Sequence, residues 1–316
     1  MQPSEIQLRA AAVRQNIEKV LVGKSKEIEL VLTALLSNGH VLLEDAPGTG
    51  KTTLAKALAK SVDCRFKRIQ FTPDLLPTDL TGLNYYSPKT GEFAFRPGGL
   101  FTNILLADEI NRATPRTQSG LLECMEERQI TVDSDTYPLA PPYFVIATQN
   151  PVETQGTFPL PEAQLDRFLM QLSVGYPSPE GEADIIGRFI GESPLETLSP
   201  AVSGAELVEM QKSVSGVKIH PDIRKYIVDL TRATREHETV ALGVSPRGSL
   251  MLARAAQSFA AVRGRAFVTP EDVKFLAPYV YSHRLILRGV GQSDRKSQAV
   301  EDALARVPAP TEAIWS

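Results

Sequence analysis

The sequence predicts an α/β fold: a parallel sheet forms the core, and a smaller helical domain follows it. Three observations support this prediction. Short apolar runs alternate with amphipathic segments in the first half of the chain, a glycine-rich turn joins one run to the next helix, and convincing strand patterns stop after Val174. Strands that alternate with helices favour a parallel sheet covered on both faces.

The composition is that of an ordinary folded protein. Of 316 residues, 42% are hydrophobic and 22% are charged, far from disordered or membrane composition. The net charge of -3 argues against nucleic acid as the main partner, because nucleic-acid binders usually carry a basic excess. With no secretory pattern and no apolar run of about 18 residues, we expect a cytoplasmic protein without membrane insertion.

The first predicted helix spans residues 26–37. Its apolar residues fall on one helical face: Ile28, Val31, Leu32, Leu35 and Leu36. The Asn38-Gly39 stop signal then leads into a short buried strand at 40–43. The elements expected after it are a helix at 51–61, strands at 66–71 and 103–107, a helix at 115–127 and a strand at 143–148.

Two hairpins are expected to interrupt this alternation, at 83–95 around the turn at 87–91 and at about 129–139. We predict a sheet domain over residues 1–176, with insertions near 72–100 and 129–139, and a helical domain over 177–316. Two pairs in the later part resemble helix capping boxes: Ser203 with Glu206, and Thr269 with Asp272.

Residues 44–53, Glu-Asp-Ala-Pro-Gly-Thr-Gly-Lys-Thr-Thr, lie between a predicted strand and a predicted helix, which is the context of a phosphate-binding loop. Main-chain N–H groups can face an anion there because glycines leave the approach open. Lys51 would reach the β and γ phosphates of ATP, and Thr52 would ligate Mg²⁺. The other residues assigned to the nucleotide are Gly48, Thr49, Gly50 and Thr53. The alternative is a glycine-rich turn with a chance Lys-Thr pair.

Asp45 departs from the strict pattern of this loop, which has glycine at that position. The residue there would need a backbone conformation that a non-glycine residue can hold, and aspartate tolerates left-handed geometry better than most. Because the rest of the loop is intact, we expect nucleotide binding to survive.

An acidic pair follows the apolar strand at 103–107. Strand ends share one edge in a parallel sheet, so Asp108 should lie beside the phosphate loop and hold Mg²⁺ directly or through water. Glu109 would orient or deprotonate the attacking water. A solvated turn or a helix N-cap is the alternative for such a pair.

Three segments together resemble the MoxR family of AAA+ ATPases: the phosphate loop, residues 108–113 (Asp-Glu-Ile-Asn-Arg-Ala) and residues 147–151 (Ala-Thr-Gln-Asn-Pro). The similarity runs from about residue 5 to about residue 290. It implies a five-stranded sheet in the order 5-1-4-3-2, a helical lid, Mg²⁺-dependent ATP hydrolysis and a homo-oligomeric ring, usually hexameric. It also implies a client such as a von Willebrand factor A domain protein.

The resemblance further implies roles for single residues. Asn150 is similar to sensor 1, which positions water; its alternative is a turn residue. Arg167 resembles the arginine finger that reaches a neighbouring subunit, against a helix-end arginine paired with Asp166 or Glu162. Arg247 resembles sensor 2, which projects from a lid helix toward the γ phosphate, against a plain helix start.

The segment Val22-Gly23 resembles the segment of the family that packs on adenine; the alternative is a surface turn. Arg112 and Arg116 would contact a neighbour's nucleotide or be solvated. The histidines show no ligand spacing, and His40 is expected to be structural. Some residues are expected to serve packing only: the hairpin aromatics Tyr85, Tyr86, Phe93 and Phe95, with substrate contact as the alternative, and the buried thiols Cys64 and Cys124.

Three functions are compatible with these features. The first is a ring ATPase that remodels a partner protein or inserts a metal or cofactor into it. The second is a nucleic-acid translocase, against which the acidic charge balance speaks. The third is a nucleotide-gated scaffold with slow turnover, against which the presence of both Glu109 and Arg167 speaks.

Overall fold

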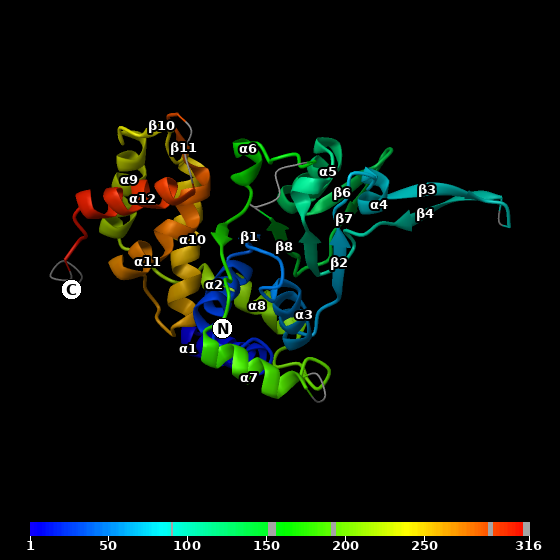
Figure 1. Cartoon of the computed structure of the whole chain (residues 1–316), viewed down its shortest axis with the longest axis horizontal. Coiled ribbons are helices and arrows are strands. Elements are labelled where there is room, and N and C mark those ends of the chain that lie inside the picture. The colour runs from blue at the N-terminus through cyan, green and yellow to red at the C-terminus, as the bar shows by residue number, and fades with distance from the viewer. Residues whose placement is uncertain (90, 151–155, 191–193, 290–292, 312–316) are drawn as a thin grey trace.

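A five-stranded parallel sheet forms the centre of the protein in the computed structural model, which describes residues 1–89, 91–150, 156–190, 194–289 and 293–311. The strand order is β2-β5-β8-β1-β9, and β2, β8 and β1 are labelled in Figure 1. The strands are β1 (Val41–Glu44), β2 (Phe66–Gln70), β5 (Ile104–Asp108), β8 (Phe144–Gln149) and β9 (Met170–Leu172). Counted along the chain, these five strands have the order 5-1-4-3-2, which confirms the expected topology.

The two faces of the sheet are covered by different helices, as expected for strands whose side chains alternate in direction. Leu43, Leu106 and Ile146 belong to the core cluster that includes the first three helices. Leu105 and Val145 belong to a second cluster, on the side of α5. The helices are α1 (Pro3–Glu18), α2 (Ser25–Leu36), α3 (Lys51–Ser61) and α5 (Pro115–Glu127).

Helix α1 was not expected from the sequence, although its apolar positions have helical spacing. Ile6, Ala10, Val13 and Ile17 are buried on one side of it. Strand β9 was implied by the resemblance but not placed, because three residues are too few for an alternating pattern. The predicted bounds of α3 and α5 agree with the structure, and those of the other core elements agree to within one residue.

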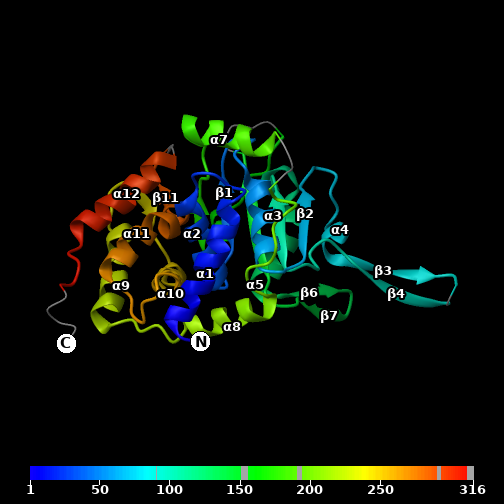
Figure 2. The same cartoon turned by 90° about the horizontal axis from the view of Figure 1, so that it is seen from below.

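Both hairpins expected from the sequence are present. The first is β3 (Gly82–Ser87) with β4 (Glu92–Pro97), after the short helix α4 (Pro77–Thr81), and it projects from the body of the protein in both views (Figures 1 and 2). The second is β6 (Gln129–Val132) with β7 (Asp135–Pro138). Thr90, in the turn of the first hairpin, lies outside the described residues. So does Pro151, the last residue of the segment 147–151.

The hairpin aromatics divide into two groups. Phe95 stacks on Tyr137 of the other hairpin with ring centroids 4.1 Å apart, which is the expected packing role. Tyr86 and Phe93 pair edge to face near the free end, and their exposed fractions are 55% and 76%. Tyr85 is also exposed. Packing therefore explains Phe95, whereas the outer aromatics are available for contact.

The later part of the chain is mainly helical. Its helices are α7 (Pro179–Phe189), α8 (Gly204–Val214), α9 (Pro221–Arg235), α10 (Pro246–Val262), α11 (Pro270–Tyr281) and α12 (Ser293–Arg306). Both expected capping boxes begin helices there, at Ser203 and Thr269. The expectation of no strands was wrong, because β10 (Val240–Leu242) pairs with β11 (Ile286–Leu287); such short strands carry no recognisable pattern.

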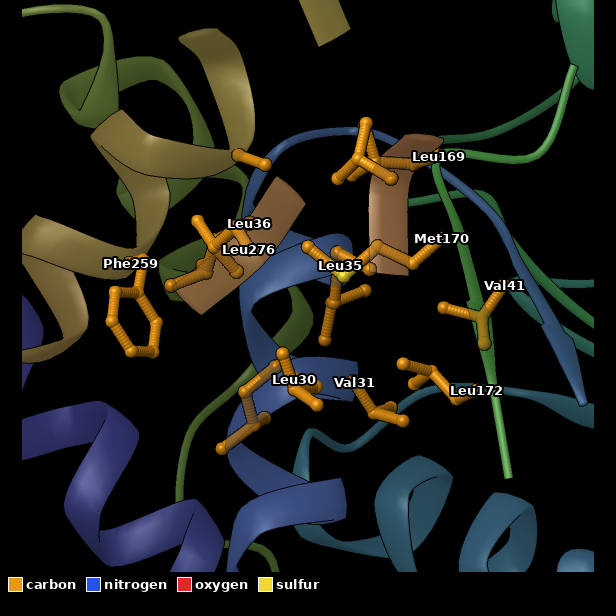
Figure 3. Close-up of a cluster of buried hydrophobic side chains, with 14 of the residues drawn as sticks. Leu30, Val31, Leu35, Leu36, Val41, Leu169, Met170, Leu172, Phe259 and Leu276 are labelled. Atoms are coloured by element: carbon orange, nitrogen blue, oxygen red, sulfur yellow. The ribbon is translucent and has the colours of Figure 1, made fainter. Parts of the chain in front are cut away.

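The apolar core is continuous between the sheet and the later helices. Leu35 and Leu36 of α2 belong to the same cluster as Met170 of β9 and Leu276 of α11, and all four are labelled in Figure 3. Helix α8 packs on α1 and α2 as well as on α10. The division of the chain at residues 176 and 177 therefore stays a proposal.

His40 and the two cysteines lie outside the candidate site. His40 accepts a hydrogen bond from the Val145 N–H at Nδ1 and faces the Met125 carbonyl with Nε2, and burial lowers its pKa well below the usual value. Burial also raises the pKa of the Cys64 thiol to about 11 and that of Cys124 to about 12. Cys124 is buried as expected, whereas Cys64 is only half-buried. Among the described helices, none combines the length and the apolar character needed to cross a membrane.

Candidate active site

The predicted phosphate loop connects β1 to α3. Gly48 and Gly50 have φ values of +84° and +90°, in the left-handed region that glycine adopts without strain. A Cβ atom on Gly50 would also lie 3.1 Å from the Leu21 side chain. The two glycines thus allow the chain to turn sharply from the strand into the helix, whose N-terminus begins at Lys51.

Lys51 stays close to its own loop. Its Nζ donates hydrogen bonds to the carbonyl oxygens of Asp45 and Ala46, at 2.9 and 3.0 Å. The Thr49 hydroxyl donates to the Ala46 carbonyl at 3.3 Å. An anion placed at this loop would compete with two carbonyl oxygens for the ammonium group, and a phosphate offers a stronger, charged acceptor.

Asp45 does not have the left-handed backbone that its position in the motif suggested. The described non-glycine residues with positive φ include Glu109 but not Asp45. The backbone conformation at Asp45 is therefore one that a non-glycine residue can hold, as expected, and this position does not require glycine.

The acidic pair lies beside the loop. The Asp108 carboxylate accepts hydrogen bonds from the Thr148 hydroxyl at 2.6 Å and from Arg68 Nη2 at 2.6 Å. Glu109 has φ 56° and ψ 51°, a left-handed conformation that costs a non-glycine residue about 1–3 kcal/mol. Its Oε2 accepts from Gln70 Nε2 at 2.6 Å and pairs with Arg112 Nε at 3.1 Å. Both acids therefore have defined orientations.

Thr148 of β8 connects the two acids. Its hydroxyl accepts from the Glu109 N–H at 2.8 Å and donates to Asp108 Oδ1. The residue is 1% exposed, so no water replaces these bonds at low cost. No role was predicted for Thr148 beyond its place in the segment 147–151, although a polar residue at the end of an apolar strand is a recognisable signal.

Replacing Thr148 with valine should lower the free energy of unfolding by about 1–3 kcal/mol, because a buried donor and a buried acceptor lose their partner. Urea denaturation measures this change. The matched control is Thr131→Val on the exposed face of β6, expected to stay within about 0.5 kcal/mol. Equal stability of the two variants would contradict the bridging role of the hydroxyl.

A cavity of about 660 Å³ brings the predicted groups together. Its lining includes Pro47, Gly48, Gly50, Lys51, Thr52, Thr53, Arg68, Asp108, Glu109, Arg112 and Asn150. Two segments 57 residues apart in sequence thus share one site, as the parallel-sheet argument predicted. Asn150 is 6% exposed at the wall of this cavity.

The oxygen groups of this cavity fit a magnesium ion. The Thr52 hydroxyl and the Asp108 carboxylate are hard ligands, and Mg²⁺ in nucleotide sites uses one or two such protein ligands and completes its shell with phosphates and water. Within the described residues no cluster of three or more His, Cys, Asp or Glu side chains suits a metal.

A second cavity of about 480 Å³ adjoins the phosphate loop. It is lined by Val20, Leu21, Val22, Lys24, Gly48, Thr49, Gly50, Thr53, Tyr176, Pro177, Glu182, Ile185, Ile186 and Phe189. Val22, which the resemblance assigns to the adenine, lines this cavity, whereas Gly23 is not among its lining residues. The contribution of α7 was missed; its amphipathic pattern was the available signal.

Arg167 and Arg247, the two arginines predicted to act at the site, lie together outside the cavity at the phosphate loop. Arg167 Nε is 3.1 Å from Glu126 Oε2, and Arg247 Nη1 is 2.6 Å from Glu126 Oε1. Neither arginine lines the cavity at the phosphate loop. Arg247 lies in the first turn of α10, which begins at Pro246, and its side chain donates to Glu126 of α5 and does not line the cavity at its own phosphate loop.

The segment that carries Arg167 is fixed by a buried arginine. Arg284 is 6% exposed and donates to the Asp166 carboxylate at 2.7 Å and to the Phe168 carbonyl at 2.6 Å. Asp166 was an alternative partner for Arg167, but in the structure it pairs with Arg284 and, at 3.8 Å, with Arg247 Nε. Arg112 lines the phosphate cavity in its own chain, and Arg116 is exposed on α5.

Comparisons with known proteins agree with this geometry. A model of the ATPase family associated with various cellular activities (AAA) matches residues 40–170, and a AAA lid domain matches residues 232–304. "Uncharacterized protein YeaC" of Bacillus subtilis is 53% identical over 86% of this chain and 85% of its own length. "Chaperone MoxR1" of Mycobacterium tuberculosis is 44% identical over 86% and 74%. The crystal structure of a putative ATPase from Cytophaga hutchinsonii has a TM-score of 0.90 at 38% identity and covers 98% of this chain and 97% of that one.

The sheet order, the phosphate loop after the first strand and the acidic pair after the third define a P-loop ATPase of the AAA+ class. Binding and hydrolysis of ATP follow from this class. Within it, the chain belongs to the MoxR family.

Proposed function

We propose that this ATPase is Mg²⁺-dependent, works as a homo-oligomeric ring, and uses ATP hydrolysis to remodel a partner protein. One observation carries the proposal. Lys51 and Glu109 share a cavity, whereas Arg167 and Arg247 are held together on Glu126, outside that cavity. A site completed by a second copy accounts for this separation.

Within one chain, the phosphate loop would hold the triphosphate through main-chain N–H groups and Lys51. Thr52 and Asp108 would hold magnesium, which when bound neutralises charge on the phosphate oxygens. Arg68 forms an ion pair with Asp108 and lines the same cavity. It would either keep this ion pair when magnesium binds or contact a phosphate.

Glu109 would orient the attacking water or accept its proton, assisted by Asn150 from the end of β8. The strained backbone at Glu109 supports this role, because such strain persists where the surrounding structure enforces it and is frequent at active sites. Gln70 and Arg112 hold its carboxylate toward the cavity.

Arg167 and Arg247 would act on the nucleotide of a neighbouring subunit. Their shared partner Glu126 is a carboxylate, so the pair is already arranged to bind one anion. A neighbour's γ phosphate would take the place of that carboxylate. Both arginine side chains are 31–40% exposed, which leaves them accessible to another chain.

The client is proposed from two sources. A relative bears the name of a chaperone, and the family resemblance points to proteins with a von Willebrand factor A domain, into which a metal or cofactor is inserted. The exposed aromatics Tyr86 and Phe93 on the projecting β3–β4 hairpin offer an apolar contact for such a client. A ring of six, acting in the cytoplasm, is the arrangement that we propose.

Replacing Lys51 with alanine should abolish detectable binding of Mg²⁺-ATP, because the ammonium that reaches the β and γ phosphates is removed. Isothermal titration calorimetry on both proteins measures this. Lys56→Ala is the matched control, because Lys56 is exposed on the same helix. Unchanged affinity of the Lys51 variant would contradict the assignment of residues 44–53 as the phosphate-binding loop, and with it the proposed mechanism.

A further inference from the structure

The Asp45 side chain connects the phosphate loop to a distant part of the chain. Its Oδ1 accepts from the Ser173 hydroxyl at 2.7 Å and from the Gly175 N–H at 3.0 Å, and its Oδ2 accepts from the Val174 N–H at 2.6 Å. Asp45 is 6% exposed. Three donors therefore converge on one buried carboxylate, and both of its oxygens act as acceptors.

This contact begins where the sheet ends. The β1–β9 ladder finishes at Leu43 and Leu172, after which the two main chains diverge. Beyond that point the side chain of Asp45 supplies the acceptors that a continuing strand would have supplied to Val174 and Gly175. The carboxylate therefore extends the pairing of the two chains past the strands.

The segment held by Asp45 leads directly into the wall of the second cavity. Tyr176 and Pro177 line that cavity, and α7 follows them. The Tyr176 carbonyl is held from the other side by Lys24 Nζ at 2.9 Å, and Lys24 is itself buried at 9% exposure. Buried contacts thus fix the position of this wall relative to the phosphate loop.

The main chain of Asp45 contacts the phosphate loop itself. Its carbonyl accepts from Lys51, and its N–H donates to the Gln149 carbonyl at 3.4 Å. The backbone thus belongs to the phosphate site, while the carboxylate is directed away from it toward residues 173–175. The two functions of the residue are spatially separate.

We infer that Asp45 is a positioning residue that sets the distance between the phosphate loop and the wall at Tyr176, so that one nucleotide occupies both cavities at once. This inference rests on the proposed function, in which the loop binds the triphosphate, and on the family resemblance, which assigns to the adenine Val22, a lining residue of the second cavity. Two linked subsites bind a joined ligand more tightly than either fragment only when their geometry matches the ligand.

The test compares ATP with inorganic tripolyphosphate, which has the phosphates without the nucleoside. Calorimetric titrations with both magnesium complexes are made on the unmodified chain and on Asp45→Asn. The amide cannot accept all three hydrogen bonds, so affinity for ATP should fall about tenfold or more through loss of the linkage. Affinity for tripolyphosphate should change less than about twofold, because its contacts lie on the main chain and Lys51.

Two outcomes would overturn the inference. An equal loss for both ligands would mean that Asp45 only shapes the phosphate loop, and no loss for either would mean that the carboxylate is dispensable. Failure of the proposed function has a different signature: the unmodified chain would bind neither ligand, or Lys51→Ala would bind both unchanged.

Two further variants separate positioning from stability. Ser173→Ala removes one of the three donors, and it should reduce ATP affinity about twofold to fivefold with tripolyphosphate unaffected, even if Asp45→Asn fails to fold. Asp272→Asn is the matched control, because that carboxylate is also buried and accepts from the Thr269 N–H, far along the chain in α11. It should leave the ratio of the two affinities unchanged. A Ser173 variant with an unchanged ratio would contradict the inference.

Discussion

Replacing Glu109 with glutamine should stop ATP turnover while leaving ATP binding nearly intact. The carboxylate lines the phosphate cavity and is the group that we assign to the attacking water. A positioned general base typically contributes about 10²–10⁴ in rate, and the neutral amide cannot accept the proton. Steady-state phosphate release should therefore fall by at least about a hundredfold. Calorimetry should show ATP affinity within about threefold of the unmodified chain, because the phosphate contacts are untouched.

The matched control for this variant is Glu123→Gln, an identical change at an exposed position of α5. It should hydrolyse ATP at the unmodified rate. Gln70 can still donate to the amide oxygen at position 109, so the local structure should survive the substitution. Phosphate release near the rate of the unmodified chain would exclude Glu109 from the chemistry, whatever its geometry suggests.

The sequence was sufficient for those features that depend on neighbouring residues. The order of strands and helices in the core followed from apolar periodicity and stop signals, and the phosphate loop followed from its glycines between a strand and a helix. Asp108 could be placed beside Lys51 because parallel strands end at one edge of a sheet. Each of these inferences needs only local pattern and general topology.

Other features depend on contacts between distant residues, which no local pattern records. The partners of Asp45 lie about 130 residues further along the chain, so the sequence showed a departure from a motif without showing its purpose. Likewise, Arg247 was expected near its own phosphate loop, but Glu126, 121 residues away, decides its direction. In both cases a single carboxylate determines what the motif residue does.

The remaining differences between the predicted and the observed structure concern short strands, helix α1 and the backbone of Glu109. Strands β9, β10 and β11 have two or three residues, which is below the length at which alternation is visible. Helix α1 was different, since the helical spacing of Ile6, Ala10, Val13 and Ile17 was present in the sequence but was not interpreted as a helix. The left-handed backbone of Glu109 could not be read from its residue type, because glutamate seldom adopts it.

Replacing Arg167 with alanine should leave ATP binding by isolated subunits within about threefold of normal, since the side chain lies outside the phosphate cavity. Turnover by the assembled form should fall about 10³–10⁵-fold, the range known for arginines that stabilise charge on a transferring phosphoryl group. The matched control is Arg263→Ala, because Arg263 Nε also pairs with a glutamate, Glu29, at 3.1 Å. That variant should keep its ATPase rate.

Mixing two inactive variants then tests whether Arg167 acts on a neighbour. In a mixture of Arg167→Ala with Lys51→Ala, each variant retains the group that the other lacks. Where a Lys51 variant presents its intact Arg167 to the nucleotide bound by an Arg167 variant, one complete site forms at their interface. Phosphate release should therefore reappear in the mixture and vary with the ratio of the two proteins. If the mixture is no more active than its components, Arg167 does not complete a neighbour's site, and the separation of the arginine pair from the phosphate cavity needs another explanation.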